Sequence, residues 1–290
     1  MVDYATLKGW PFGVVRHSYA PRDVMLYALG CGLGADPLDR QQLAFVYGPQ
    51  LKVLPSMAAV LGTPGSWWRL PGTGVAWEHV LHAQQDVSFF APLPTEATVM
   101  GHNRVTHLHD RGAGRGAVAA LVRDVVAEDG TLLAQARRIE VLRQDGGFSA
   151  AGGPSDDPPP RLESLPPDCG RPDAELDLAT LPQAALIYRL SGDPNPLHAD
   201  PDVARMAGFP RPILHGLGSF GFAAHAVLRS CCDYAPDALR RLALRFASAV
   251  FPGDTLNFQL WRHDARHVRF RAWARERGQL VLDHGLAEVA

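Results

Sequence analysis

The sequence predicts an α+β fold built from two similar halves, each with its own antiparallel sheet. The first observation is a repeat at nearly constant spacing. Tyr27-Ala28-Leu29 corresponds to Tyr188-Arg189-Leu190 at an offset of 161, and Val53-Leu54-Pro55 to Ile213-Leu214-His215 at an offset of 160. Because 290 residues are ample for two medium domains, a duplicated unit fits the length.

The second observation is a segment at residues 146–172 that is rich in Gly, Pro, Asp and Ser. Such a composition cannot hold a regular helix or a central strand, so it indicates an interdomain linker. We therefore expect an N-terminal repeat at 1–145, a linker at 146–175 and a C-terminal repeat at 176–290.

The third observation is the alternation of polar and apolar residues, which is typical of half-buried antiparallel strands. Hairpin signals stand at matching places in the two halves, Glu128-Asp129-Gly130 and Glu276-Arg277-Gly278. The strands that this pattern predicts are residues 117–122, 132–136, 255–260 and 268–273.

Apolar runs at residues 56–61 and 217–228 predict one buried helix in each half. Pro21 and Pro182 indicate the starts of shorter helices, because proline is favoured in the first turn.

Asp193, Asn195 and His198 lie within six residues of each other in the second half, on a turn stiffened by Pro194 and Pro196. A rigid loop of this kind can aim a carboxylate and an imidazole at one small reactant. A solvated carboxylate activates water poorly, so we expect Asp193 to be partly buried, which raises its basicity. Alternatively, Asp193 only forms an Asx turn or caps a helix, and His198 is a core histidine.

A second cluster, His215-Gly216, stands at the start of the apolar run in the same half. A glycine at a helix start offers a free backbone N–H at the positive end of the helix dipole. That group suits an oxyanion that develops on a substrate.

These clusters resemble the hydratase 2 (MaoC-like) family of enoyl-CoA hydratases and dehydratases. The family pattern is a Tyr, a small residue and Gly-Asp-x-Asn-Pro-Leu-His, then a His-Gly pair; here it stands as Tyr188, residues 191–198 and His215-Gly216. Residues 27–30, 51–55 and 81–85 resemble the first half of the two-repeat members. The resemblance implies a double hot-dog, in which each repeat is a long central helix wrapped by an antiparallel β-sheet.

The resemblance also implies an activity, the reversible addition of water to a trans-2-enoyl thioester to give a (3R)-3-hydroxyacyl-CoA. Asp193 and His198 match the catalytic acid/base pair of the family. Asn195 matches a residue that supports the pair, and Gly216 matches the oxyanion donor.

The first repeat lacks this chemistry, because Gly32 and Pro37 stand opposite Asp193 and His198. We expect it to be non-catalytic and to support the substrate pocket of the second repeat.

Five further residues are candidates for substrate binding. His215 either touches substrate or holds the loop by a hydrogen bond. Phe246 matches a residue that lines the family's substrate site, although ordinary core packing is the alternative. His82 and Ala83 match a family His-Gly pair near the CoA, with Ala in place of Gly. Arg111 replaces a Lys in a family loop that meets CoA phosphates; a solvated hairpin is the alternative.

We expect no metal or other cofactor, because hydration of an enoyl thioester needs none. His107 and His109 have the spacing of a metal pair, but no third ligand is evident nearby, and we assign them to a loop surface. The expected partner is the acyl-CoA substrate, and the resemblance also implies that the protein forms a homodimer.

The formal net charge of −2 gives no reason to expect nucleic acid or an anionic membrane as a partner. Neither a signal peptide, a membrane span nor a peroxisomal address is evident, and the four cysteines show no metal spacing. We therefore expect a cytoplasmic enzyme.

Three alternatives stay open at this point. The enzyme is a dehydratase for a short, branched or dicarboxylic acyl-CoA, or for an acyl-carrier-protein substrate; it is a thioesterase on the same scaffold; or it is a catalytically silent acyl-CoA-binding subunit.

Overall fold

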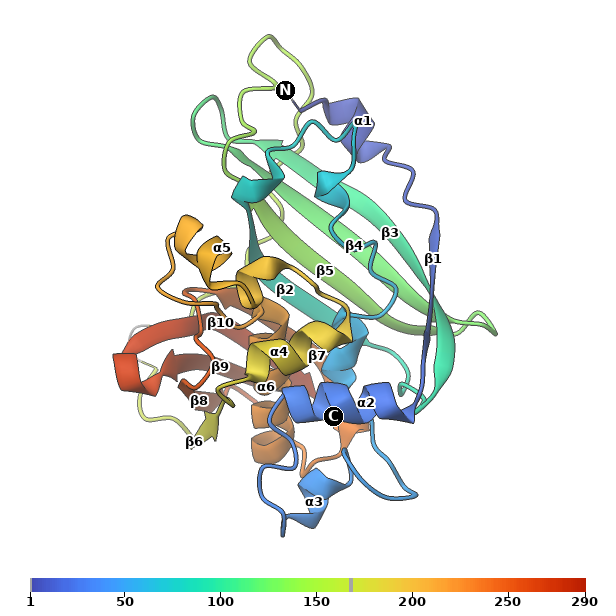
Figure 1. The fold of residues 1–290 in the computed structure, drawn as a ribbon, viewed down its shortest axis with the longest axis vertical. Coiled ribbons are helices and arrows are strands. Elements are labelled where there is room, and N and C mark those ends of the chain that lie inside the picture. Colours follow the sequence, from blue (N-terminus) through green and yellow to red (C-terminus); the bar gives the residue numbers. More distant parts are fainter. Residues whose placement is uncertain (1, 167–168) are drawn as a thin grey trace.

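One antiparallel sheet runs through both halves of the chain (Figure 1). A computed structural model describes residues 2–166 and 169–290, and within them ten strands pair in the order β1-β3-β4-β5-β2-β7-β10-β9-β8-β6. The strands are β1 Val14–Tyr19, β2 Val80–Phe89, β3 Ala97–Asp110, β4 Ala117–Ala127, β5 Leu132–Leu142, β6 Ala174–Ala179, β7 Leu239–Phe246, β8 Thr255–Arg262, β9 His267–Ala274 and β10 Gln279–Val289.

The two halves of the sheet have the same topology. In each half the first strand lies at the outer edge, followed by the third, fourth, fifth and second strands. The second strands, β2 and β7, pair with each other, with Gln84 opposite Arg245 and Ser88 opposite Arg241. A pseudo-twofold axis therefore passes between β2 and β7, and the predicted duplication and double hot-dog sheet are confirmed.

Most of the predicted elements are present. The four predicted strands fall within β4, β5, β8 and β9, and both hairpin signals connect neighbouring strands of the sheet. The first strand of the second half, β6, begins at Ala174, inside the expected linker. The helices are α1 Tyr4–Lys8, α2 Pro21–Gly30, α3 Arg40–Leu43, α4 Ala184–Tyr188, α5 Pro201–Met206 and α6 Gly216–Cys231.

The central helix differs between the halves. In the second half α6 spans 16 residues, and residues 218–228 within it are buried. The first half has only a short 3-10 helix, Pro55–Ala59, so the expected helix at 56–61 and a long central helix in both repeats were wrong for this half. The segment cannot continue into a long helix, because Gly62 follows it closely and has φ +64°, a left-handed conformation that a right-handed helix does not contain.

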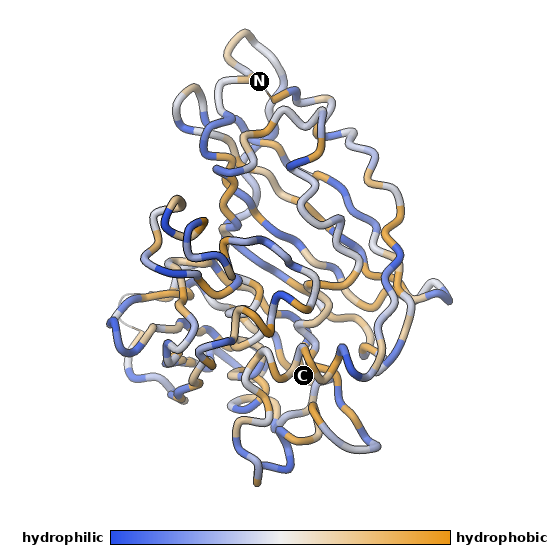
Figure 2. Tube along the Cα trace, viewed as in Figure 1, coloured by the Kyte–Doolittle hydropathy of each residue, from blue (hydrophilic) through white to orange (hydrophobic). Residues whose placement is uncertain are grey.

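Helix α6 serves as the core of both halves. A Cβ at Gly221 would overlap the Cys31 sulfur, and one at Gly32 would lie 2.6 Å from the Phe222 ring, so both glycines permit close packing between α6 and the segment after α2. Apolar side chains from both repeats meet in one cluster around it. Hydrophobic and hydrophilic positions alternate along the strands that wrap this core (Figure 2).

The expected linker is packed against the first repeat over part of its length. Asp156 accepts hydrogen bonds from Tyr4 Oη at 2.8 Å, Lys8 Nζ at 2.9 Å and the Leu108 N–H at 2.7 Å. Residues 167–168 of the linker and Met1 lie outside the described residues. Among the described helices, none has the length and hydropathy needed to cross a bilayer.

Buried His225 on α6 links the repeats and makes stability depend on pH. Its Nδ1 donates to the Cys31 carbonyl at 3.2 Å, and its Nε2 lies 3.2 Å from Tyr234 Oη. Burial lowers the pKa of His225 from 6.5 to about 4. The unfolded chain therefore binds a proton that the folded chain refuses between these values, and stability is lost as the pH falls from about 6.5 toward 4.

We expect His225→Gln to flatten this pH dependence by at most about 3 kcal/mol. Urea unfolding at pH 7.5 and pH 4.5 measures the effect. His263→Gln, at an exposed histidine between β8 and β9, is the control and keeps the wild-type pH dependence. An unchanged slope in His225→Gln would show that this histidine is not one of the titrating groups.

Candidate active site

The turn after α4 carries the first predicted cluster. Gly192, with φ +110°, reverses the chain just before Asp193. The Asn195 N–H donates to Asp193 Oδ1 at 3.1 Å, which fixes one edge of the carboxylate. The Asn195 side-chain oxygen accepts from the Leu197 N–H at 3.1 Å and caps the 3-10 helix Pro196–His198. Asn195 thus holds Asp193 through its backbone, while its side chain shapes the turn.

His198 is buried and held in one tautomer. Its Nδ1 lies 2.9 Å from the Ile213 carbonyl oxygen, which can only accept, so Nδ1 carries the proton and Nε2 keeps a lone pair. Burial lowers the pKa of His198, and the bond to Ile213 and the Asp193 charge oppose this only in part. The imidazole is therefore neutral near pH 7, with a basic nitrogen available.

His215 connects the two clusters. Its ring stacks on His198 with centroids 3.7 Å apart and planes 26° from parallel, and its Nε2 donates to the Asp193 backbone carbonyl at 3.2 Å. Burial and the neighbouring His198 lower the pKa of His215 to about 4. These contacts fit the predicted loop-holding role, while Nδ1 is buried without a partner among the described residues and is available to a ligand.

The turn brings the predicted acid and imidazoles together. A carboxylate oxygen of Asp193 and one ring nitrogen each of His198 and His215 lie within 4.8 Å of one another. Asp193 is half-buried, and His198 is 8% exposed, so neither side chain faces bulk solvent freely. The Asx-turn alternative is present as a hydrogen bond, but it uses only one of the two carboxylate oxygens.

Gly216 is the first residue of α6, so its N–H belongs to the group of helix-end donors without an intrahelical partner. A Cβ at Gly216 would lie 3.3 Å from the Phe246 ring, and this close packing places the aromatic ring over the helix start. Phe246 ends β7, and the His82 ring packs edge-on against it with centroids 5.0 Å apart. Because β2 and β7 pair, the first repeat contributes His82 to the site.

Polar residues of β5 surround His82, and sequence reasoning missed them. Glu140 stands opposite His82 in the sheet, 3.5 Å from Arg138 Nε, and accepts from Trp68 Nε1 at 2.7 Å. Burial lowers the pKa of His82 to about 4, although the Glu140 charge opposes this. Arg138 and Glu140 could have been noticed as a charged pair on an otherwise apolar face of β5. Their position beside His82 could not be predicted, because it depends on the register between β2 and β5.

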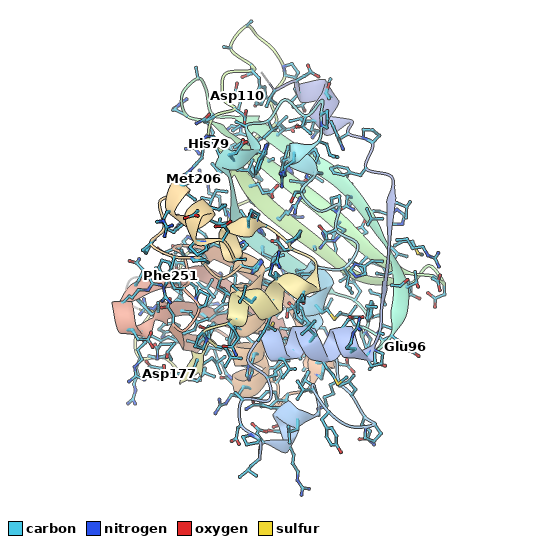
Figure 3. The ribbon with its side chains drawn as sticks, viewed as in Figure 1. His79, Glu96, Asp110, Asp177, Met206 and Phe251 are labelled. Atoms are coloured by element: carbon cyan, nitrogen blue, oxygen red, sulfur yellow. The ribbon has the colours of Figure 1, made fainter. Side chains whose placement is uncertain are left out.

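The remaining candidates lie farther from the turn. Ala83 is half-buried in β2, at a register shift beside His82. Arg111 is exposed in the turn between β3 and β4, and no contact brings it into the cluster of Asp193, His198 and His215 among the described residues. The neighbouring Asp110 lies toward the same end of the N-terminal sheet as His79 (Figure 3).

The two histidines with the spacing of metal ligands were expected on a loop surface, and this expectation was wrong. His107 and His109 lie within strand β3, not on a loop. His109 Nδ1 lies 2.9 Å from the Asp156 carbonyl, and His107 Nδ1 lies 3.2 Å from Thr106 Oγ1.

The Asn195 backbone holds Asp193 and the Asn195 side chain caps the turn, so removing the side chain should separate these two roles. In Asn195→Ala the backbone N–H still holds Asp193, while the cap of the Pro196–His198 turn is lost at a cost of about 1 kcal/mol. We expect kcat to fall by about tenfold, far less than when Asp193 loses its carboxylate. Steady-state kinetics and thermal unfolding measure the two effects, and a loss as large as that of Asp193→Asn would assign the Asn195 side chain to the chemistry itself.

Comparison with known proteins identifies two domains in the chain. Residues 17–143 match the MFE-2 hydratase 2 N-terminal domain, and residues 169–282 match the MaoC like domain. The junction between the two matches falls within the Pro- and Gly-rich segment.

Related proteins are similar over nearly the whole chain. The peroxisomal enoyl-CoA hydratase 2 of Arabidopsis thaliana is 38% identical over 283 residues, 92% of this chain and 89% of that protein. The enoyl-CoA hydratase ChsH3 of Mycobacterium tuberculosis is 36% identical and covers 92% of each chain. The crystal structure of a MaoC-like dehydratase from Phytophthora capsici superimposes with a TM-score of 0.86 at 28% identity, over 100% of this chain and 99% of that one. The chain belongs to the hydratase 2 (MaoC-like) family.

Proposed function

We propose that this protein is a hydro-lyase that reversibly hydrates trans-2-enoyl-CoA to (3R)-3-hydroxyacyl-CoA. The observation that carries the proposal is the convergence of the Asp193 carboxylate and the His198 ring beside the start of α6. Relatives named as enoyl-CoA hydratases match 92% of this chain, which supports the same reaction.

The catalytic water binds between Asp193 and His198. Both groups can accept a hydrogen bond, because the Asp193 carboxyl group has acceptor oxygens and His198 Nε2 holds a lone pair. The water donates one hydrogen to each. As its oxygen attacks C3, one of the two groups takes a proton, and that proton is then delivered to C2. The hydroxyl and the hydrogen thus come from one water and add to the same face of the double bond.

The thioester oxygen gains charge during this attack. The Gly216 N–H at the start of α6 donates to it, aided by the positive end of the helix dipole. Phe246 and His82 form the wall beside this donor, and we assign both to substrate binding. Arg111 and Ala83 are assigned to binding of the CoA part of the substrate, as the family resemblance implies.

The first repeat, residues 1–145, supports the substrate pocket without catalysing hydration. His82 from β2 contacts Phe246 of the second repeat, so the pocket wall is shared between the halves. A C-terminal fragment that stays soluble and fully active on long acyl chains would contradict this division of roles.

The reaction proceeds without a metal or cofactor. Asp193, His198 and His215 have atoms close enough to hold an ion, but the two imidazoles are stacked within 26° of parallel. Lone pairs that lie in nearly parallel planes converge poorly on one tetrahedral centre. Activity that survives dialysis against a chelator supports this assignment, and loss that zinc restores would overturn it.

The proposal includes an acyl-CoA substrate, a cytoplasmic location and a homodimer, without nucleic-acid or membrane partners. Light scattering of the purified chain measures the oligomeric state, and a mass of one chain would contradict the dimer.

A spectrophotometric hydration assay tests the function. Loss of enoyl-thioester absorbance is followed with crotonyl-, octenoyl- and mesaconyl-CoA, and the product is resolved by chiral chromatography. We expect the (3R) isomer alone. Release of free CoA would identify a thioesterase, and binding without turnover would identify a silent acyl-CoA-binding subunit.

The pH dependence of the rate should follow His198. Because burial lowers the pKa of His198 below its ordinary 6.5, the neutral ring persists below that pH. We expect kcat for crotonyl-CoA to stay level from pH 8 to about 6.5 and to fall at lower pH as His198 takes up a proton. A rate that rises on acidification would mean that the imidazolium is the active form.

A further inference from the structure

A pocket of about 280 Å³ opens at the opposite end of the β2–β7 pair from the catalytic turn. Phe89, the last residue of β2, lines it, as Phe246 at the end of β7 lines the active site. The pair Gln84–Arg245 near one end of these strands corresponds to Ser88–Arg241 near the other. The pseudo-twofold axis therefore relates this pocket to the active site.

The correspondence extends to the other walls. Val53 and Pro55 stand where the second repeat has Ile213 and His215, and both line the pocket. Leu239, the first residue of β7, stands where the active site has His82. The pocket has thus kept the position of an active site and has apolar side chains in place of two imidazoles. The first repeat also lacks the acid–base pair, because Gly32 and Pro37 stand opposite Asp193 and His198.

Charge at the rim shows what the pocket can hold. Arg240 lines it, is exposed, and occupies the position that corresponds to Ala83 in the first repeat. Lys52 also lines it and donates to the Tyr234 carbonyl at 2.9 Å, while Asp237 is the acidic lining residue. Two cations against one anion at the mouth of an apolar pocket favour a ligand with an apolar chain and a negatively charged head.

We propose that this pocket is a second acyl-CoA site that binds the thioester and does not hydrate it. The acyl chain lies against Val53, Phe89 and Leu239, and the phosphates of CoA lie outside, near Arg240 and Lys52. The choice of a CoA thioester rests on the proposed function, because the pseudo-twofold axis maps the CoA side of the active site onto Arg240.

Calorimetric titration with decanoyl-CoA, which is saturated and cannot be hydrated, tests the proposal. We expect two equivalents to bind per wild-type chain. We expect one equivalent in Ala91→Trp, which fills the pocket from a half-buried position, with kcat for crotonyl-CoA within about twofold of wild type. One equivalent in the wild-type protein would overturn the proposal.

Charge reversal separates the head group from the chain. Arg240→Glu should weaken the second site about tenfold, whereas Arg16→Glu, a matched reversal on exposed β1, should leave both sites intact. Both substitutions are at exposed residues, so these two variants still test the proposal if Ala91→Trp fails to fold. Equal affinity in Arg240→Glu, or displacement of the second equivalent by decanoate as readily as by decanoyl-CoA, would contradict a CoA site. Failure to hydrate crotonyl-CoA with two equivalents still bound would contradict only the proposed function.

Discussion

Asp193→Asn is expected to lower kcat for crotonyl-CoA hydration by roughly 10³–10⁴-fold, in the upper part of the usual range of about 10²–10⁴ for a lost general acid–base group. The asparagine has the same shape and can still accept the Asn195 N–H through its oxygen. It cannot take a proton from water near neutral pH, so the chemistry is lost while the turn is kept. KM should change little, because the substitution leaves the walls formed by Phe246 and His82 in place.

The control for this variant is Asp202→Asn, at a carboxylate whose side chain is 79% exposed on α5. It makes the same replacement of a carboxylate by an amide, a few residues away from Asp193, and should keep wild-type kinetics. Circular dichroism and thermal unfolding of both variants check that the fold is intact. A kcat for Asp193→Asn within tenfold of wild type would show that Asp193 is not the acid–base group.

His198→Gln is expected to cause a loss of similar size, about 10³-fold in kcat. The glutamine side chain is neutral and polar like the imidazole, but it offers no basic nitrogen to the water. The pH dependence supplies a second readout, because the fall in rate below pH 6.5 should disappear with the titrating ring.

His102→Gln, at an exposed histidine of β3, is the matched control and should match wild type at every pH. An acid limb that persists in His198→Gln would assign the titration to another group, and a wild-type rate would reduce His198 to a buried structural histidine.

Sequence reasoning found the turn that carries Asp193 and His198 because the geometry of this turn is largely local. Gly192, the two prolines and the Asn195 cap fix the turn within a few residues. The orientation of His198 also depends on its bond to the Ile213 carbonyl, which lies farther along the chain. Alternation and the hairpin signals predicted the antiparallel strands for a similar reason, since side-chain direction along a strand has a period of two.

What sequence reasoning missed depends on contacts between distant segments. The shared core, in which Gly221 of α6 packs closely against Cys31 of the first repeat, joins segments that are far apart in the sequence. The placement of His82 against Phe246 requires β2 to pair with β7, and the Glu140 neighbour requires the register of β5. Neither pairing leaves a mark within a single strand, because register is set by the partner.

A double-mutant cycle on kcat tests most directly whether Asp193 and His198 act on one shared water. Asp193→Asn, His198→Gln and the combined variant are compared with wild type on crotonyl-CoA. If both acceptors serve the same proton transfer, either loss removes the step, and the combined variant should be about as slow as the slower single variant. Losses that multiply, so that the combined variant is slower by the product of the two single effects, would show two independent roles and contradict the shared water.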